Sequence, residues 1–218
     1  MLYTNRHDAF IKCQWKINMI LRSSPPSPFG RKIKIAIAVL GLSDKITVEM
    51  TDTMDPEDSI RGQNPLGKIP ALVLDDGTVI YDSRVVAEYL DYMAGGGKII
   101  PTSADRFPAL TMQALADGIM DAGILQVYEV RFRPEEIRHP DWLAYQAEKV
   151  TRALTVLEAA PPAMEGTPHI GHIALACALG YQDFRFHGTW RGKYPNLVAW
   201  LDEFADKVPA FAATMPPV

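Results

Sequence analysis

Cysteine is scarce in this chain of 218 residues: only Cys13 and Cys177 occur, far apart in the sequence. A disulfide scaffold needs more cysteines at closer spacing, so it is excluded and a reduced, cytoplasmic protein is expected. Residues 1–16 lack the apolar core of a secretion signal. No apolar run reaches the length of a membrane span, so no membrane partner is expected.

Basic clusters are missing as well. The formal net charge is −4, from 22 Lys and Arg against 26 Asp and Glu, and no basic run stands out. A nucleic-acid surface needs such a patch, so no nucleic acid is expected as a partner. Hydrophobic residues make up 48% of the chain, enough for a substantial core.

Metal ligands are equally sparse. His169 and His172 are three residues apart but lack a third acidic or thiol partner nearby, which makes a poor zinc site. The segment Gly95–Lys98 lacks the spacing of a phosphate-binding loop and is interpreted as a linker. No metal is therefore expected.

The first part of the chain alternates strand and helix signals. The expected elements are a strand at 17–22, a helix at 29–41, a strand at 46–50, short strands at 71–74 and 78–81, and a helix from 82 to about 93. The helix at 29–41 has an alternation that would also suit a strand, but Ser27-Pro28 supplies an N-cap and a first-turn proline. Asp75-Asp76-Gly77 predicts a hairpin. The order describes a thioredoxin-like domain of mixed sheet at residues 17–94.

The second part predicts only helices. Gly95–Gly97 and Pro101 mark a linker at 95–103, and the helical domain covers 104–218. Helices are expected at 104–131, 140–160, 173–181 and 194–204. The first of these carries Leu115, Ile119, Ala122 and Leu125 at helical spacing. Residues 1–16 are interpreted as an extension, because a compact domain could itself begin near Met19.

Several motifs carry a resemblance to a known family. The segments RSSPPSPFGRKIKIAIAVLGL, NPLGKIPAL and IYDSRVVAEYLD, in this order, resemble the N-terminal domain of glutathione S-transferases, with features of the tau and omega classes. ALADGIMDAG and IALACALGYQDFRF resemble the helical half of bacterial members. The resemblance covers residues 17–210. It implies an α/β thioredoxin-like domain followed by an all-α helical bundle, glutathione as co-substrate, and a homodimer.

Ser27 is the candidate catalytic residue. The glutathione thiol has an ordinary pKa of about 8.5, and lowering it by two units takes about 2.7 kcal/mol of preferential stabilisation of the thiolate. A hydroxyl donor at a helix N-terminus can supply this, although Ser27 could simply cap the helix. The resemblance puts the activating serine, or the omega-class cysteine, at Ser27, with Ser24 as the fallback. A serine there favours conjugation over thiol–disulfide exchange, and the adjoining Phe29 is assigned to the glutathione site.

Two further segments complete the expected glutathione site. The resemblance implies a cis peptide bond before Pro70, which would let the Ile69 backbone pair with the cysteinyl unit. Lys68 would meet the glycine carboxylate, or would be an ordinary solvated lysine. Ser83 suits the γ-glutamyl carboxylate and Asp82 suits the α-amino group, although the two could also form a plain N-cap.

The second substrate is expected between the N-terminal domain and residues 107–130. The candidate pocket residues are Met112, Asp117, Met120 and Tyr128. Asp117 and Asp121 are four residues apart and share one helix face, which is interpreted as a polar face near a subunit contact. Where the family has a Ser/Thr-x-x-Asp capping box, this chain has His169-Ile-Gly-His172, a departure that predicts a weaker helix start.

The function implied is glutathione conjugation to small, mostly apolar electrophiles, with a role in detoxification. One alternative is a non-catalytic binding or regulatory protein of the same fold. Another is a zeta-type, glutathione-dependent isomerase, which ranks lower because that class usually carries a Ser-Ser-Cys loop.

Overall fold

The computed structural model describes residues 18–217; the extension expected at residues 1–16 lies outside them. The strands are β1 (Met19–Ser23), β2 (Ile46–Met50), β3 (Ala71–Val73) and β4 (Val79–Ile80). The helices are α1 (Pro28–Val39), α2 (Ile60–Gln63), α3 (Ser83–Met93), α4 (Arg106–Phe132), α5 (Pro140–Ala159), α6 (Ile170–Phe186), α7 (Pro195–Lys207) and α8 (Ala210–Ala213). Single turns of 3₁₀ helix occur at Ser43–Lys45, Glu135–Ile137 and Arg191–Lys193.

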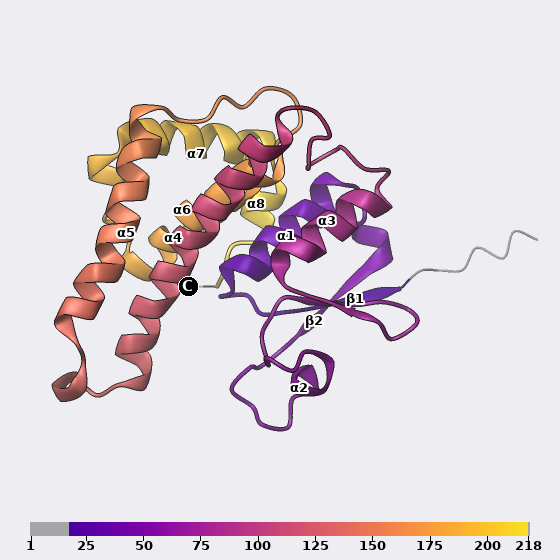
Figure 1. The fold of residues 1–218 in the computed structure, drawn as a ribbon, viewed down its shortest axis with the longest axis horizontal. Helices are drawn as coiled ribbons and strands as arrows, with labels where there is room; N and C mark the ends of the chain where they lie inside the picture. Colours follow the sequence, from indigo (N-terminus) through magenta and orange to yellow (C-terminus); the bar gives the residue numbers. More distant parts are fainter. Residues whose placement is uncertain (1–17, 218) are drawn as a thin grey trace, which may run out of the picture.

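The N-terminal part is built on a four-stranded sheet in the order β2-β1-β3-β4. Strands β1 and β2 are parallel and are joined through α1, while β3 runs antiparallel to both β1 and β4. Arg22 of β1 pairs with Ala71 of β3, so the end of β1 lies beside the residue that precedes β3. Figure 1 shows α1 and α3 together between the sheet and the helical part, with α2 on the sheet's other side. The expected thioredoxin-like arrangement is confirmed.

The C-terminal part is entirely helical, as expected. The long helix α4 packs against α5 and α6, and α6 also packs against α1 (Figure 1). Every residue of α6 from Ile170 to Gln182 is buried, because this helix lies in the middle of the bundle. Among the helices of residues 18–217, none combines the length and the apolar character that crossing a membrane requires.

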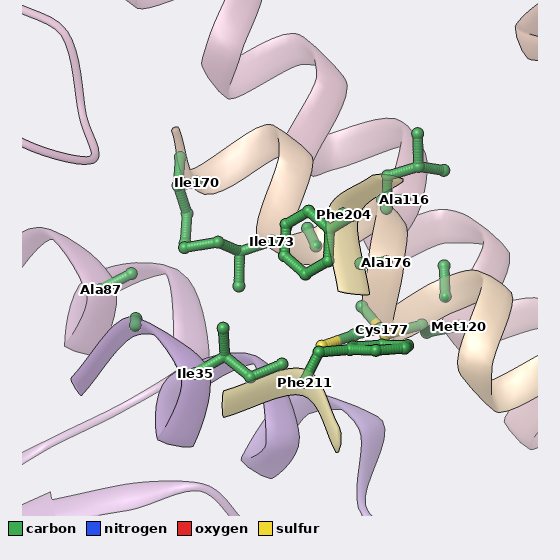
Figure 2. Packing of buried hydrophobic residues seen from close by; sticks show 14 of the residues in the cluster. Ile35, Ala87, Ala116, Met120, Ile170, Ile173, Ala176, Cys177, Phe204 and Phe211 are labelled. Carbon is green, nitrogen blue, oxygen red and sulfur yellow. The ribbon is translucent and has the colours of Figure 1, made fainter. Parts of the chain in front are cut away.

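One hydrophobic core joins the two parts. Figure 2 shows Ile35 of α1, Ile173 and Cys177 of α6, Phe204 of α7 and Phe211 of α8 converging on it. Phe204 and Phe211 meet edge to face, with ring centroids 5.7 Å apart. Because α1 and α6 share buried side chains, the sheet domain is held firmly against the helical bundle.

The four apolar residues noted at helical spacing in α4 are not all buried. Ile119 and Ala122 are buried, but Leu115 and Leu125 are 38% and 40% exposed. The helical spacing therefore marked the helix correctly but did not show which of its sides is covered. The short helices α2 and α8 were also absent from the expected list, since four-residue helices give no periodic signal.

The start of α6 corrects a second expectation. His169 is the N-cap, and its Nδ1 accepts the backbone N–H groups of Gly171 at 3.0 Å and His172 at 3.3 Å. The N–H of His169 is in turn donated to Nδ1 of His172 at 3.3 Å. The two rings stack with centroids 3.6 Å apart. The histidines therefore form a complete capping box, and the expected weakness of this helix start is absent at neutral pH.

Asp91, at the end of α3, organises the segment that leads to α4. Its side chain is buried, and its carboxylate accepts N–H groups from Gly97, Lys98 and Ile99 at 2.7–2.9 Å. The Ile99 carbonyl then accepts the N–H of Ile170 at 2.7 Å, which ties this segment to α6. The predicted linker is thus held by a buried carboxylate.

Candidate functional site

Ser27 is the N-cap of α1. Its hydroxyl oxygen accepts the backbone N–H of Gly30 at 3.1 Å, and Pro28 occupies the first helical position. Because the hydroxyl uses only a lone pair in this bond, its own proton is available to another acceptor. The positive end of the α1 dipole lies at the same point, so the position favours an anion.

The loop between β1 and α1 is closely packed. Gly30 lies against Ser23, and a Cβ at Gly30 would overlap the Ser23 hydroxyl. Ser23 is buried, and the carbonyl of Ser24 accepts the N–H of Ser27 at 3.2 Å. Ser27, but not Ser24, lines the cavity between α1 and α6. Phe29 is half-buried and packs against the core.

The Ile69–Pro70 peptide bond is cis, as the motif predicted. Pro70 directly precedes β3, so the register of β1 and β3 places it beside Ser23. The segment is held by Asn64, a buried residue missed in the sequence, whose side-chain amide donates to the Lys68 carbonyl at 2.8 Å. Lys68 itself is exposed and Ile69 is half-buried. Their backbone is therefore held in place just before the start of β3.

Asp82 and Ser83 begin α3. The Asp82 carboxylate accepts the N–H of Arg84 at 3.0 Å and so acts as the N-cap. Ser83 is buried, whereas Asp82 is exposed. The N-cap alternative for this pair is therefore confirmed for Asp82. The N-terminus of α3 is also a position that suits a bound carboxylate.

A buried ion-pair cluster joins the helices that carry these motifs. Lys32 of α1 donates to both oxygens of Asp117 of α4, at 2.8 and 3.0 Å, and Arg84 of α3 donates to the same carboxylate at 2.9 Å. Lys32 is 0% and Asp117 1% exposed. Burial lowers the pKa of Lys32, and the Asp117 carboxylate opposes that shift. Hydrogen bonding to Asp117 raises the pKa of Arg84.

The cluster fixes the relative position of two helix N-termini. Ser27 lies five residues before Lys32, and Ser83 directly precedes Arg84. Asp117 therefore holds the start of α1 and the start of α3 against the same point of α4. Removing Lys32 or Asp117 is costly, because the buried charge of the other one stays desolvated.

Comparison with known proteins identifies the architecture. Residues 26–92 match the family model of the glutathione S-transferase N-terminal domain, and residues 126–203 match that of the C-terminal domain. The chain belongs to the glutathione S-transferase family. The GST-like protein YibF of Escherichia coli K12 is 35% identical over 206 residues, covering 91% of this chain and 99% of YibF.

Solved structures agree with this assignment. A glutathione transferase family member from Pseudomonas fluorescens Pf-5, with bound glutathione, matches with a TM-score of 0.85 and 41% identity, covering 92% of this chain and 100% of that one. A glutathione S-transferase from Methylobacillus flagellatus KT, with glutathione bound, matches with a TM-score of 0.84 and 33% identity, covering 91% and 100%.

The structure separates the four residues that were expected to line a second-substrate pocket. Asp117 is not a pocket residue or part of an exposed polar face, since it is buried between two cations. Met120 is 0% exposed and belongs to the core, and Met112 packs near the start of α6 at Gly171. Tyr128 does line a cavity, of about 770 Å³, between the C-terminal half of α4 and the start of α5.

Residues beside Ser27 that the sequence did not single out come from α6 and the C-terminus. Tyr181, Phe184 and Pro216 line the same narrow cavity as Ser27. Tyr181 and Phe184 are aromatic residues near the end of a helix whose earlier residues are mostly small and apolar. This contrast in the sequence could have indicated them as candidate site residues. Within residues 18–217, no group of three or more His, Cys, Asp and Glu side chains could hold a metal ion.

Proposed function

We propose that this protein is a glutathione transferase that conjugates glutathione to small, mostly apolar electrophiles. The observation that carries the proposal is the hydrogen bonding of the Ser27 hydroxyl. Its oxygen accepts the Gly30 N–H at 3.1 Å, so its proton is free for a sulfur at the start of α1. The glutathione bound in the relatives from P. fluorescens and M. flagellatus supports the choice of co-substrate.

In this proposal the tripeptide extends along the edge formed by the three motifs. Ile69 would pair its backbone with the cysteinyl unit, and exposed Lys68 would meet the glycine carboxylate. Ser83 and the α3 N-terminus would bind the γ-glutamyl carboxylate, with Asp82 near its amino group. Phe29 would pack beside the sulfur.

The proposed step is a displacement or an addition at an electrophilic carbon. With an aryl or alkyl halide, the sulfur–carbon bond forms while the carbon–halogen bond breaks. The halide leaves with the bonding electron pair, and the thiol proton passes to solvent. Ser27 donates a hydrogen bond to the thiolate throughout and forms no covalent bond itself.

We also propose a cytoplasmic homodimer with a role in detoxification. Exposed apolar side chains on α3 and α4 support an interface there: Val85, Tyr92, Phe107, Leu115 and Leu125. Sedimentation should give twice the mass of the chain, and Phe107→Glu should reduce it to that of a monomer. A wild-type protein that sediments as a monomer at micromolar concentration would contradict the dimer.

The test of function compares Ser27→Ala with Ser24→Ala, the fallback serine. Ser27→Ala should cut kcat/KM for conjugation by at least about tenfold and raise the thiol pKa of bound glutathione, as read from ultraviolet thiolate absorbance. The loss of the cap should cost only about 1 kcal/mol, so the variant should remain folded. Ser24→Ala should behave as wild type.

Two results would contradict the proposal. Failure of the wild-type protein to bind glutathione resin would favour the non-catalytic alternative. Full activity of Ser27→Ala together with an inactive Ser24→Ala would move the catalytic role to Ser24.

A further inference from the structure

Ser27 borders a narrow slot between the two domains. Its walls include Pro26 from the loop before α1, Tyr181 and Phe184 from α6, and Pro216 from the C-terminal segment. None of the residues expected to bind the glutathione backbone lines this slot. In the proposed function, this side of Ser27 is left for the second substrate.

The slot is nearly closed. Its volume is about 10 Å³, enough for one water molecule at most. Rigid proline rings form much of the wall, and the aromatic rings of Tyr181 and Phe184 oppose them. A substrate that reaches Ser27 through this slot must therefore be compact, or it must displace part of the wall.

The C-terminal wall has a dedicated anchor in Arg31 of α1. Arg31 is 4% exposed; its guanidinium donates to the Phe211 carbonyl at 2.6 Å and to the Thr214 hydroxyl at 3.3 Å. The same guanidinium lies 4.0 Å from the centroid of the Phe211 ring. Thr214 precedes Pro216 by two residues, so Arg31 sets where the last wall residue lies.

Gly180 makes this anchor possible. A Cβ at position 180 of α6 would lie 2.5 Å from Nη1 of Arg31 and 3.3 Å from the Phe211 ring. The guanidinium passes across α6 only because that side chain is missing. Three separate segments thus cooperate to hold the C-terminal residues over the slot: α1, α6 and α8.

We propose that Pro216, positioned by Arg31 through Phe211 and Thr214, sets the size limit of the second substrate. The proposal rests on the proposed transferase function. It assigns as substrates compact electrophiles, such as α,β-unsaturated carbonyl compounds that carry no bulky group at the reacting carbon. In that addition the sulfur bonds to the β-carbon and the C=C π electrons move to the carbonyl oxygen as an enolate. The thiol proton leaves to solvent, and solvent protonates the enolate carbon.

The experiment compares two enones, methyl vinyl ketone and trans-4-phenyl-3-buten-2-one, with saturating glutathione. Comparing the ratio of their kcat/KM values between variants cancels their different intrinsic reactivities. Pro216→Gly should raise the ratio in favour of the phenyl compound by at least about tenfold, the effect of a modest volume change in an apolar pocket. The matched control is Pro217→Gly, whose proline is exposed and does not line the slot. It should leave the ratio within about twofold.

Thr214→Val tests the anchor while preserving side-chain shape. It removes the oxygen that accepts from Arg31, and it should shift the ratio in the same direction as Pro216→Gly, by a smaller factor. Glutathione affinity should stay unchanged in all three variants, which separates a change in the slot from general damage.

An unchanged ratio in Pro216→Gly, with both enones still converted, would overturn the size limit and leave the transferase function standing. An equal shift in Pro217→Gly would also overturn it. No glutathione-dependent conversion of either enone by the wild-type protein, together with no retention on glutathione resin, would overturn both proposals.

Discussion

The histidine capping box at the start of α6 should make the protein sensitive to mild acid. Nδ1 of His169 accepts two backbone N–H groups, and Nδ1 of His172 accepts a third. A protonated imidazole carries hydrogen on both nitrogens, so it has no lone pair left to accept these bonds. Protonation of either ring therefore opens the box at the N-terminus of the most deeply buried helix.

The size of the effect follows from the pKa of His172. Burial, followed by the neighbouring His169 and Lys207, lowers this pKa to about 4, and a hydrogen bond with the Ala163 backbone opposes the shift. Burial lowers the pKa of His169 too. In the unfolded chain a histidine has a pKa of about 6.5. Above that value neither state binds the proton, and His172 adds no pH dependence.

As the pH falls through 6.5, His172 becomes protonated in the unfolded chain but stays neutral in the folded protein, so the free energy of unfolding decreases. For His172 alone the loss is about 2 kcal/mol at pH 5 and about 3 kcal/mol near pH 4, where the folded protein also becomes protonated and the loss levels off. His169 adds to this loss in the same direction. Such a change is a large fraction of the stability of a typical domain.

The assay is urea unfolding at about pH 7.5 and about pH 5, followed by circular dichroism. The control is the double variant His169→Ser/His172→Asp, which restores a serine–aspartate capping box and keeps its acceptors at both pH values. Acid effects elsewhere in the protein cancel in the difference between the two proteins. The wild type should lose about 2 kcal/mol more than the control. Parallel losses in both proteins would refute the reasoning.

The remaining predictions concern buried groups. Asp117→Asn should cost about 3–5 kcal/mol in urea unfolding, because it leaves the buried ammonium of Lys32 without its partner; Asp121→Asn, at an exposed position of the same helix, should cost under about 0.5 kcal/mol, and equal losses would contradict the assignment. Asp91→Ala should cost at least about 3 kcal/mol by freeing buried N–H groups; a melting temperature unchanged from wild type would show that water replaces them. Burial raises the pKa of Cys177 to about 12, so in a Cys13→Ser background an aromatic disulfide reagent should label no thiol until urea unfolds the protein; rapid labelling of the native protein would contradict this.

Much of the fold could be predicted from local sequence. The strand at 46–50 was predicted at the bounds that the structure has. The helix expected from 82 to about 93 begins one residue later, at Ser83, because Asp82 is its N-cap. Ser27-Pro28 decided between strand and helix for α1, since a cap and a first-turn proline act within four residues. The cis bond before Pro70 was expected only from the resemblance of its segment to the family.

Contacts between distant segments were beyond the reach of local patterns. Asp117 looked like a pocket or surface carboxylate, yet folding brings it to Lys32, 85 residues away in the chain. Leu115 and Leu125 fit the helical period but face outward, because the elements around α4 decide which of its sides is covered. Periodicity shows that a helix has two faces; it does not show which neighbours cover them.

The sequence alone determined the family, the order of the elements and the serine at the start of α1, because each depends on residues close together in the chain. Only the tertiary structure placed Pro216 beside Ser27 and directed Arg31 across Gly180 to hold it. Those contacts join the two ends of the folded chain, and they exist only once both domains share one core.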